Sequence, residues 1–290
     1  MLLNGVFLIT EGLSPMRIEE LLKQTDKLPN VPDVVRELIQ LLNDPDANYS
    51  DISQRVAHDQ TISLKILRMV NSAYFGLSRK ISSIDEATVL LGMSKLKTLV
   101  IASGFSSSVE KVEGINLPAF WADSFRVAEL AKWVAKRTEL VDEDEAFTVG
   151  IVHNIGRLLL HLTQPDLALE VQTLVNNRKA SRVKAEQDLL GFTTQDAGKA
   201  LMDMWKFPVA MGDAVQQHKR PFMNDEPQAL ACVLNLACYL NACIRNDRDS
   251  DLVREGFPMA VAKGAGLGEG ILFELDDALI IGDGLNQLLD

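Results

Sequence analysis

The segment of this 290-residue chain with the clearest potential for chemistry runs from Gly150 to Arg157. Its sequence, Gly-Ile-Val-His-Asn-Ile-Gly-Arg, predicts an apolar helix that breaks to expose His153 and Asn154. An imidazole is a common metal ligand, whereas the neutral amide of Asn154 binds divalent cations weakly and bridges two of them poorly. From these residues alone, His153 belongs either to a metal or ligand site or to the core, bonded there to a backbone carbonyl.

A second group of motifs lies upstream of this segment. In chain order they are Leu28–Pro32, Asp51–Ala57, Asp59-Gln60, Leu64–Phe75, Ile81–Ala87 and Leu90–Gly92. The elements Leu-Arg-x-x-Asn-Ser-Ala-x-Phe and Ile-x-Ser-Ile-x-x-Ala, the latter followed by Leu-Gly, are specific ones. Over roughly residues 22–220 the series resembles the HDOD family, the HD-related output domain of bacterial signalling proteins. The segment around His153 is similar to the His-Asp signature of the HD superfamily of metal-dependent phosphohydrolases.

The resemblance implies seven positions for the pocket of an HD enzyme. They are Asp123, His153, Asn154, Thr194, Gln217, His218 and Cys238. Only His153 and His218 keep the ligand type expected there, and Asp123 is a substitution that can still coordinate. A two-metal phosphohydrolase needs about five or six nitrogen or oxygen ligands to place both cations and an activated water. We therefore expect a degenerate pocket with no metal, no cofactor and no catalytic residue.

The resemblance further implies a non-catalytic bacterial signal-transduction module that acts through contacts with signalling proteins, whose identity the sequence does not give. Two alternatives stay open. One is a metal-dependent phosphohydrolase of nucleotides or cyclic dinucleotides, and the other is a sensor that binds a nucleotide or small anion in the degenerate pocket without turnover. The lost ligands argue against the enzyme, and a ligand-induced thermal shift would identify the sensor.

The segment from Asn71 to Phe75 allows two interpretations. Asn71 and Ser72 can cap helix ends while Tyr74 and Phe75 anchor the turn in apolar surroundings, which would make a structural elbow. Alternatively, these four side chains form an interaction surface for a partner. Both interpretations are open at this point.

The charge balance limits the classes of partner. The chain has 29 basic and 40 acidic residues, a net charge of −11. This balance argues against DNA or an anionic membrane as a partner, because both require an extended positive surface. One basic cluster stands out along the sequence, with Arg178, Lys179, Arg182 and Lys184.

Several features indicate a cytoplasmic protein. No stretch of eighteen apolar residues occurs, so we expect no membrane-spanning helix. The apolar start, Met1 to Ile9, lacks the basic region and cleavage site of a signal peptide. The spacing of Cys232, Cys238 and Cys243 matches no zinc or disulfide pattern, so we expect buried thiols in a reducing compartment.

The elements that must position these residues are helices. Apolar side chains recur at helical spacing along most of the chain, and no segment alternates clearly enough to predict a strand. The helices expected after residue 118 are at about 119–138, 146–162 with its break, 166–177, 181–190, 195–205, 208–218 and 227–245. We therefore predict an all-α fold, an HD-domain-like helical bundle with two helical lobes.

The expected organisation has three parts. An N-terminal segment covers residues 1–21, the HDOD domain covers 22–220, and an acidic C-terminal extension covers 247–290. The two lobes span about 22–103 and about 118–246. The extension has ten acidic and three basic residues, and a Gly-rich loop at 263–270 separates two short acidic helices. Its apolar stripe predicts that it packs back on the body, and the stripe comprises Leu272, Phe273, Leu275, Leu279, Ile280, Leu285 and Leu288.

Overall fold

The computed structural model describes residues 17–24, 35, 37–38, 56–71, 77–92, 96, 99–100, 103, 111–178, 181–223 and 226–281. Over these ranges the fold is all-α, as predicted, and the only strand-like feature is an isolated bridge between Val112 and Ile115. No helix within the described residues has the length and apolar character needed to cross a membrane. Ser72, Tyr74, Phe75, Lys179, Leu285 and Leu288 lie outside the described residues.

The described helices are α1 (Ile18–Leu22), α4 (Gln60–Val70), α5 (Ile84–Leu91), α7 (Leu117–Ala135), α8 (Glu143–Val152), α9 (Ile155–Thr163), α10 (Pro165–Arg178), α11 (Arg182–Leu190), α12 (Thr194–Met204), α13 (Val209–Gln217), α14 (Ala229–Arg245), α15 (Ser250–Glu255), α16 (Met259–Gly264) and α17 (Leu275–Leu279). A 3₁₀ helix, η2 (Glu269–Glu274), precedes α17. The expected ranges from 119 to 245 lie within three residues of the observed ones, and the predicted break separates α8 from α9.

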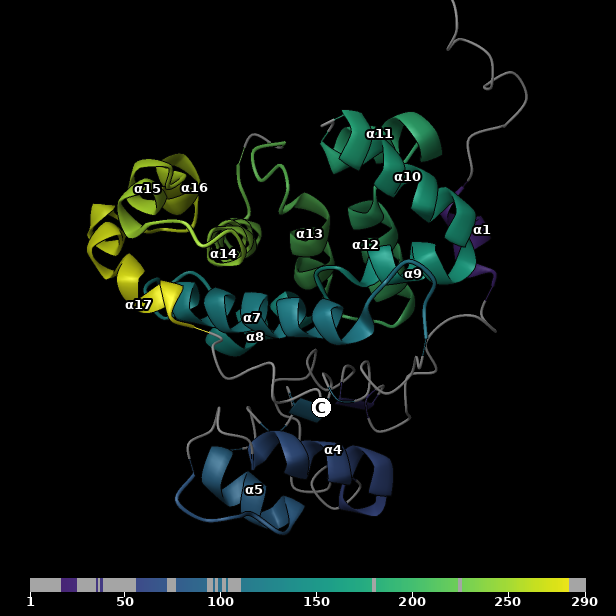
Figure 1. Cartoon of the computed structure of the whole chain (residues 1–290). Helices are drawn as coiled ribbons and strands as arrows, with labels where there is room; N and C mark the ends of the chain where they lie inside the picture. Colours follow the sequence, from purple (N-terminus) through teal and green to yellow (C-terminus); the bar gives the residue numbers. More distant parts are fainter. Residues whose placement is uncertain are drawn as a thin grey trace, which may run out of the picture.

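Helices α4 and α5 pack against each other (Figure 1). The side chain of Asn71 joins them. Its amide nitrogen donates to the carbonyl oxygens of Leu67 and Ile81, at 2.8 and 2.7 Å. Its amide oxygen accepts from the backbone N–H of Ile81 at 2.7 Å. Since these bonds use both ends of the amide, the Asn71 side chain fastens the end of α4 to the residues before α5.

Helices α7 to α14 form the helical body (Figure 1), in which α7 packs against both α8 and α14. Helix α9 packs on α12, α12 on α13, and α13 on α14, while the short α1 rests against α9 and α12. The start of α7 is fixed by Asn116, whose side-chain oxygen accepts from the N–H of Ala119 at 3.0 Å. The core of this body supplies the walls of the candidate site.

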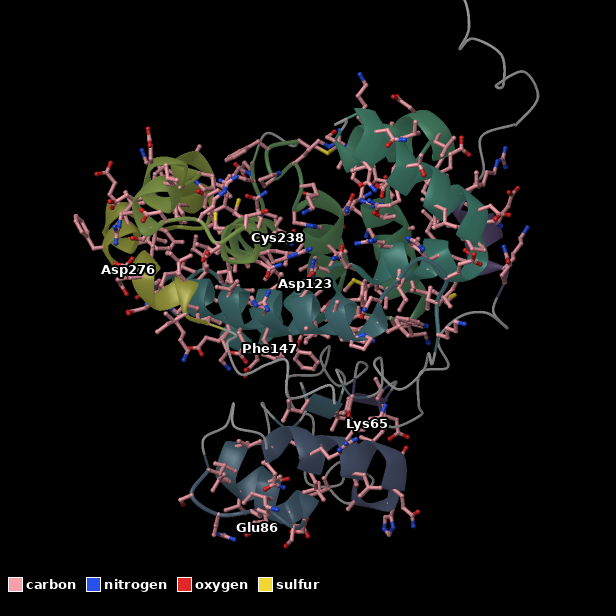
Figure 2. The ribbon with its side chains drawn as sticks, viewed as in Figure 1. Lys65, Glu86, Asp123, Phe147, Cys238 and Asp276 are labelled. Carbon is pink, nitrogen blue, oxygen red and sulfur yellow. The ribbon has the colours of Figure 1, made fainter. Side chains whose placement is uncertain are left out.

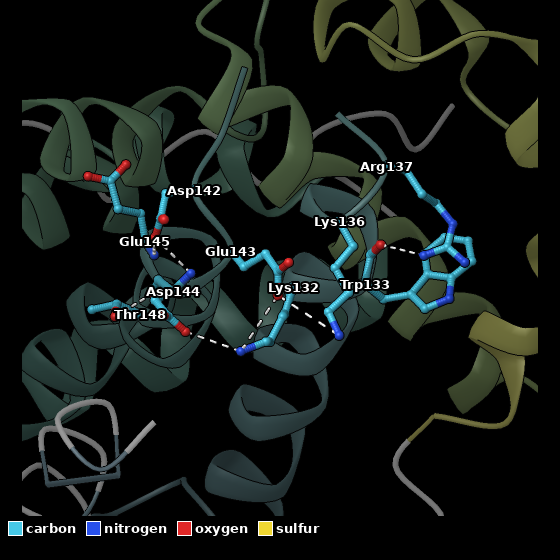
Figure 3. A network of polar contacts seen from close by, with 9 residues as sticks. All are labelled: Lys132, Trp133, Lys136, Arg137, Asp142, Glu143, Asp144, Glu145 and Thr148. Carbon is cyan, nitrogen blue, oxygen red and sulfur yellow. Dashed lines mark hydrogen bonds and ion pairs between the residues drawn. The ribbon is translucent and has the colours of Figure 1, made fainter. Parts of the chain in front are cut away.

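The acidic start of α8 is tied to α7 (Figure 3). Asp142 caps α8 by accepting from the N–H groups of Asp144 and Glu145, at 2.9 and 3.0 Å. Lys132 of α7 approaches Asp144 at 3.1 Å and Glu143 at 3.9 Å. The acidic residues therefore complement both the positive end of the helix dipole and the lysines of the neighbouring helix.

Residues 247–281 form α15, α16, η2 and α17, of which α16 and α17 pack on α14. Arg137 of α7 pairs with Glu274 at 2.7 Å, and its guanidinium carbon lies 3.6 Å from the centre of the Trp133 ring. Figure 2 shows Asp276 at the outer edge of this segment.

Two expectations for this segment are corrected. Within the apolar stripe, Leu275 is buried, but Phe273 is 86% exposed and Ile280 is 69% exposed. In the helical turns there, the buried face passes through Ile271, Leu275 and Ala278, so Phe273, two residues from both Ile271 and Leu275, points away from it. The Gly-rich loop is also shorter than 263–270, because α16 continues to Gly264 and η2 begins at Glu269.

Candidate functional site

The break between α8 and α9 is fixed by two glycines that flank it. His153 ends α8, and Asn154 precedes α9 without a side-chain cap hydrogen bond. A Cβ atom on Gly150 would overlap the Cα of Ala128 on α7, and one on Gly156 would overlap the carbonyl oxygen of Thr194. Since the glycines allow these close approaches, α8 is held against α7 and α9 against α12, and the break falls between them.

His153 is buried, with 5% of its surface exposed. Its Nδ1 lies 2.7 Å from the carbonyl oxygen of Gly150, so Nδ1 carries the proton and donates it, while Nε2 is left as an acceptor. Burial lowers the pKa of His153 to about 4, and the nearby charge of Lys219 acts in the same direction. The imidazole is therefore neutral at physiological pH.

A second buried imidazole stands behind the first. The rings of His153 and His218 meet edge to face, with centres 5.9 Å apart. The Nδ1 of His218 donates to the carbonyl oxygen of Val215 at 2.7 Å, and its Nε2 is buried without a hydrogen-bond partner among the described residues. Burial, with the charge of Lys219, holds the pKa of His218 well below its usual value.

A cavity of about 350 Å³ opens beside His153. Its walls come from the turn before α7, from α7, from the α8–α9 break and the first turn of α9, from Lys219 after α13, and from α14. The lining residues are Gly114, Ile115, Asn116, Ala119, Phe120, Asp123, Val127, His153, Asn154, Arg157, Lys219, Cys238, Asn241, Ala242 and Arg245. In Figure 2, Asp123 and Cys238 lie near each other, one on α7 and the other on α14.

Four of the seven positions predicted for the pocket meet at this cavity. They are Asp123, His153, Asn154 and Cys238. His218 is fully buried next to His153 and does not reach the cavity wall. Neither Thr194 nor Gln217 lines the cavity; the hydroxyl of Thr194 instead donates to the carboxylate of Glu186 at 2.9 Å. The expectation of seven pocket residues is corrected to this extent, because Thr194 at the start of α12 is held by a neighbouring helix.

The cavity also contains three cations that the sequence reading did not assign to it, Arg157, Lys219 and Arg245. Two of them could have been placed there from the sequence, because Arg157 directly follows Gly156 and Lys219 directly follows the predicted pocket residue His218. Nothing in the sequence around Arg245 relates it to the others, because it is brought in by the last turn of α14.

Asp123 is the only carboxylate among the lining residues, and it is already engaged. Its oxygens lie 2.9 Å from Nη1 of Arg245 and 3.5 Å from Nη1 of Arg126. Arg126 in turn donates to the side-chain oxygen of Asn241 at 3.2 Å. The negative charge in the cavity is thus neutralised by its own neighbours.

Arg157 and Lys219 differ from Arg245 because they have no hydrogen-bond or ion-pair partner for their side chains among the described residues. The Nε of Arg157 is buried and likewise has no hydrogen-bond partner among the described residues. Burial lowers the pKa of the Arg157 guanidinium, and the charges of Arg182 and Arg245 add to this effect, while the carboxylates of Glu186 and Asp123 oppose it. Arginine nevertheless stays protonated in proteins, so the cavity wall carries the positive charges of the half-buried Arg157 and of the exposed Lys219.

These residues do not fit the divalent metal site of an HD phosphohydrolase. No group of three or more His, Cys, Asp or Glu side chains within the described part of the chain is placed to hold a metal ion. Burial raises the pKa of the Cys238 thiol, which therefore stays protonated, while the three cations would repel a metal ion. We derive no metal-dependent step for this cavity.

The comparisons with known proteins agree with the fold. The HDOD domain matches residues 28–221. A crystal structure from Shewanella amazonensis, named "Putative phosphohydrolase", is 32% identical with a TM-score of 0.78, and the match covers 93% of this chain and 98% of that one. An HDOD domain protein of unknown function from Geobacter sulfurreducens is 23% identical, with a TM-score of 0.78 and coverage of 93% and 96%.

Curated relatives match over shorter parts of longer proteins. The protein named "Cyclic di-GMP phosphodiesterase CdgJ" from Vibrio cholerae is 31% identical over 130 residues, which is 43% of this chain and 28% of that protein. An uncharacterised protein from Treponema pallidum is 21% identical over 76% of this chain and 42% of its own length. The chain therefore spans less than half the length of the curated relatives it matches.

Proposed function

The chain belongs to the HDOD domain family, and we propose from this premise that it is a signal-transduction module without catalytic activity that acts through contacts with other proteins. The observation that carries the proposal is the charge of the cavity beside His153. Three cations line it, and its one carboxylate is engaged by two arginines. Metal-assisted hydrolysis requires carboxylates or imidazoles that fix a cation and its activated water, and this lining supports the loss of that chemistry.

The names of the relatives favour the rival interpretation, a phosphohydrolase. The Shewanella protein bears that name at 32% identity. The phosphodiesterase name of the Vibrio protein describes a whole of which only 28% is matched. These names justify testing this chain directly for hydrolysis.

The test combines metal analysis with a hydrolysis assay on the purified chain. We expect well under one equivalent of transition metal, and no hydrolysis of phosphomonoesters, nucleotides or cyclic dinucleotides above background with added Mg²⁺, Mn²⁺ or Fe²⁺. The variant Asn154→Asp should gain no activity, because the cations around it remain. Stoichiometric metal together with turnover that is abolished by His153→Ala would overturn the proposal.

Exposed apolar side chains on α4 and α5 support the second half of the proposal, contact with a protein partner. Val89 is 88% exposed, Leu64 64% and Leu90 48%. Exposed apolar patches are typical of protein–protein interfaces. Affinity capture from the source organism should recover a partner with the wild type that is lost with Val89→Glu. A control, Leu140→Glu, changes an equally apolar and 64% exposed position on the body and should retain it; equal recovery with both variants would contradict this surface.

A further inference from the structure

We propose that the cavity beside His153 is a binding site for a nucleoside phosphate, with Arg157 and Lys219 holding the phosphate and Nε2 of His153 accepting a hydrogen bond from the nucleoside. The inference rests on the proposed function, because it names the chemical signal that a non-catalytic module would receive. It uses residues on four segments that are distant in sequence and meet only in the fold.

The first observation is that two cations on the cavity wall, the half-buried Arg157 and the exposed Lys219, have no hydrogen-bond or ion-pair partner for their side chains among the described residues. Arg157 has a half-buried side chain, and its buried Nε is unsatisfied. A buried donor left without a partner costs free energy, about 1–3 kcal/mol. A guanidinium and an ammonium facing one cavity are the usual arrangement for an oxyanion, since arginine offers paired donors and lysine a point charge.

The second observation gives the ligand a direction. His153 lines the cavity although only 5% of its surface is exposed. No described residue forms a hydrogen bond with its Nε2. Because Nδ1 donates to Gly150, Nε2 can only accept. A fully deprotonated oxyanion offers no hydrogen to an acceptor, so a ligand that satisfies this nitrogen must present a hydroxyl or N–H group to it.

Size and lining complete the description. The cavity of about 350 Å³ is at the lower end of the range for small-molecule sites, which begins at roughly 300 Å³. Ile115, Phe120 and Val127 supply apolar wall between the polar groups. A phosphate, a donor-bearing sugar and a flat apolar base are the parts of a nucleoside monophosphate, and this lining accommodates each of them.

Asp123 distinguishes an anion site from a metal site by the sign of one substitution. As the only carboxylate on the wall, it repels an anion and occupies Arg245, which lies 2.9 Å from it. Replacement by asparagine would therefore strengthen the binding of a phosphate, whereas it would weaken the binding of a divalent cation at the same place. The two kinds of site predict opposite outcomes for Asp123→Asn.

The experiment measures the melting temperature and calorimetric affinity of the whole chain with AMP, GMP, CMP, UMP, orthophosphate and adenosine. We expect at least one nucleoside monophosphate to raise the melting temperature, while adenosine does not and orthophosphate binds more weakly. Arg157→Gln and Lys219→Gln should each weaken binding about tenfold, and Asp123→Asn should strengthen it. Lys263→Gln removes the same charge from an exposed site outside the cavity and should leave the affinity unchanged.

Three outcomes would overturn the inference. The first is that no nucleoside monophosphate stabilises the chain. The others are that the affinity is unchanged in both Arg157→Gln and Lys219→Gln, or that the Asp123→Asn variant binds the nucleotide more weakly than the wild type. Equal binding of orthophosphate and the nucleotides would overturn the nucleoside part of it. Arg157→Lys, which keeps the charge, should retain more affinity than Arg157→Gln, and this comparison separates a lost charge from a misfolded variant. If a nucleotide binds and is also hydrolysed, the proposed function fails while this site stands; if none binds and none is hydrolysed, the reverse holds.

Discussion

The helical body holds charged side chains in two neighbouring regions that differ in burial and in partners: Glu186 is fully buried, whereas Arg157 is half-buried and Lys219 is exposed. Around Glu186, which is fully buried, the carboxylate accepts from the backbone N–H of Thr194 at 2.9 Å and from its hydroxyl at 2.9 Å, and it forms an ion pair with Nη1 of Arg182 at 3.5 Å. Around His153, the acceptor Nε2 and the cations Arg157 and Lys219 face a cavity without partners among the described residues. The first region is closed on itself, and the second is open to a ligand.

The difference teaches that a residue's position in a family pattern does not decide its role. Thr194 is one of the seven positions that the resemblance implies for the pocket, yet it belongs to the closed cluster around Glu186. Arg157 has no place in that pattern, yet it faces the cavity. The partners that the fold supplies, rather than the residue type, separate a structural charge from one that can bind a ligand.

The largest effect that this comparison predicts is the loss of Glu186. Glu186→Ala leaves Arg182 and the start of α12 without their buried carboxylate, and breaking such a pair costs about 4 kcal/mol. Urea denaturation should show this loss of free energy of unfolding. Lys219→Ala, made in the open region, should change stability by less than about 0.5 kcal/mol. Similar losses for both variants would show that the two regions do not differ in this respect.

The next largest loss of stability is expected for a substitution at Gly156, which lies between the two regions. In Gly156→Ala the new methyl group overlaps the carbonyl oxygen of Thr194, so α9 must move away from α12. Overpacking of this kind costs about 3 kcal/mol, measurable in the same denaturation experiment. Gly268→Ala is the matched control, since nothing lies within 4 Å of its Cβ and its φ is −91°; a stable Gly156→Ala variant would argue against the close approach.

Lowering the pH should reduce the free energy of unfolding, because His153 of the open region must then take up a proton. His153 titrates near pH 6.5 when unfolded and at about 4 when folded, so the unfolded state binds the proton first. The stability due to this shift is present above pH 6.5 and is lost as the pH falls toward 4, by about 2 kcal/mol between pH 7 and 5. Denaturation midpoints across this range should fall less steeply for His153→Gln, and an unchanged slope would contradict a neutral buried imidazole.

The smallest of these effects sharpens the description of the closed region. Thr194→Val keeps the shape of the side chain and removes the hydroxyl that donates to Glu186, a hydrogen bond to a charged group worth about 1.5 kcal/mol. Thr173→Val removes a hydroxyl of an exposed threonine that donates to a backbone carbonyl, and it should cost less than about 0.5 kcal/mol. Equal melting temperatures for the two variants would mean that the Thr194 hydroxyl contributes nothing.

Much of the fold could be predicted from local sequence. Helical periodicity located α7 to α14 within three residues, because each buries a continuous apolar face. The break at His153 was also predictable, since apolar residues stop there at a polar pair. The 3₁₀ turn at η2 was not, and the exposure of Phe273 follows from it: a change from one helical period to another rotates the buried face without altering composition.

The site was only partly predictable, for a different physical reason. Asp123, His153, Asn154 and Cys238 follow from the family resemblance and meet at the cavity. The basic cluster evident in the sequence, at 178–184, consists of adjacent residues, whereas the cations of the cavity come from three separate parts of the chain. Which charges converge, and which of them lack partners, depends on tertiary packing that no local pattern encodes.

The stacking of Arg137 on Trp133 has an optical consequence. The indole is covered on one face by the guanidinium of Arg137 (Figure 3). The same guanidinium pairs with Glu274, more than 130 residues further along the chain. If the C-terminal helices leave α14, the arginine loses that carboxylate and the indole gains water, which shifts its emission to longer wavelengths. Fluorescence of a variant that keeps Trp133 as its single tryptophan, with Trp121 and Trp205 replaced by phenylalanine, would therefore follow the attachment of the C-terminal segment without an added label.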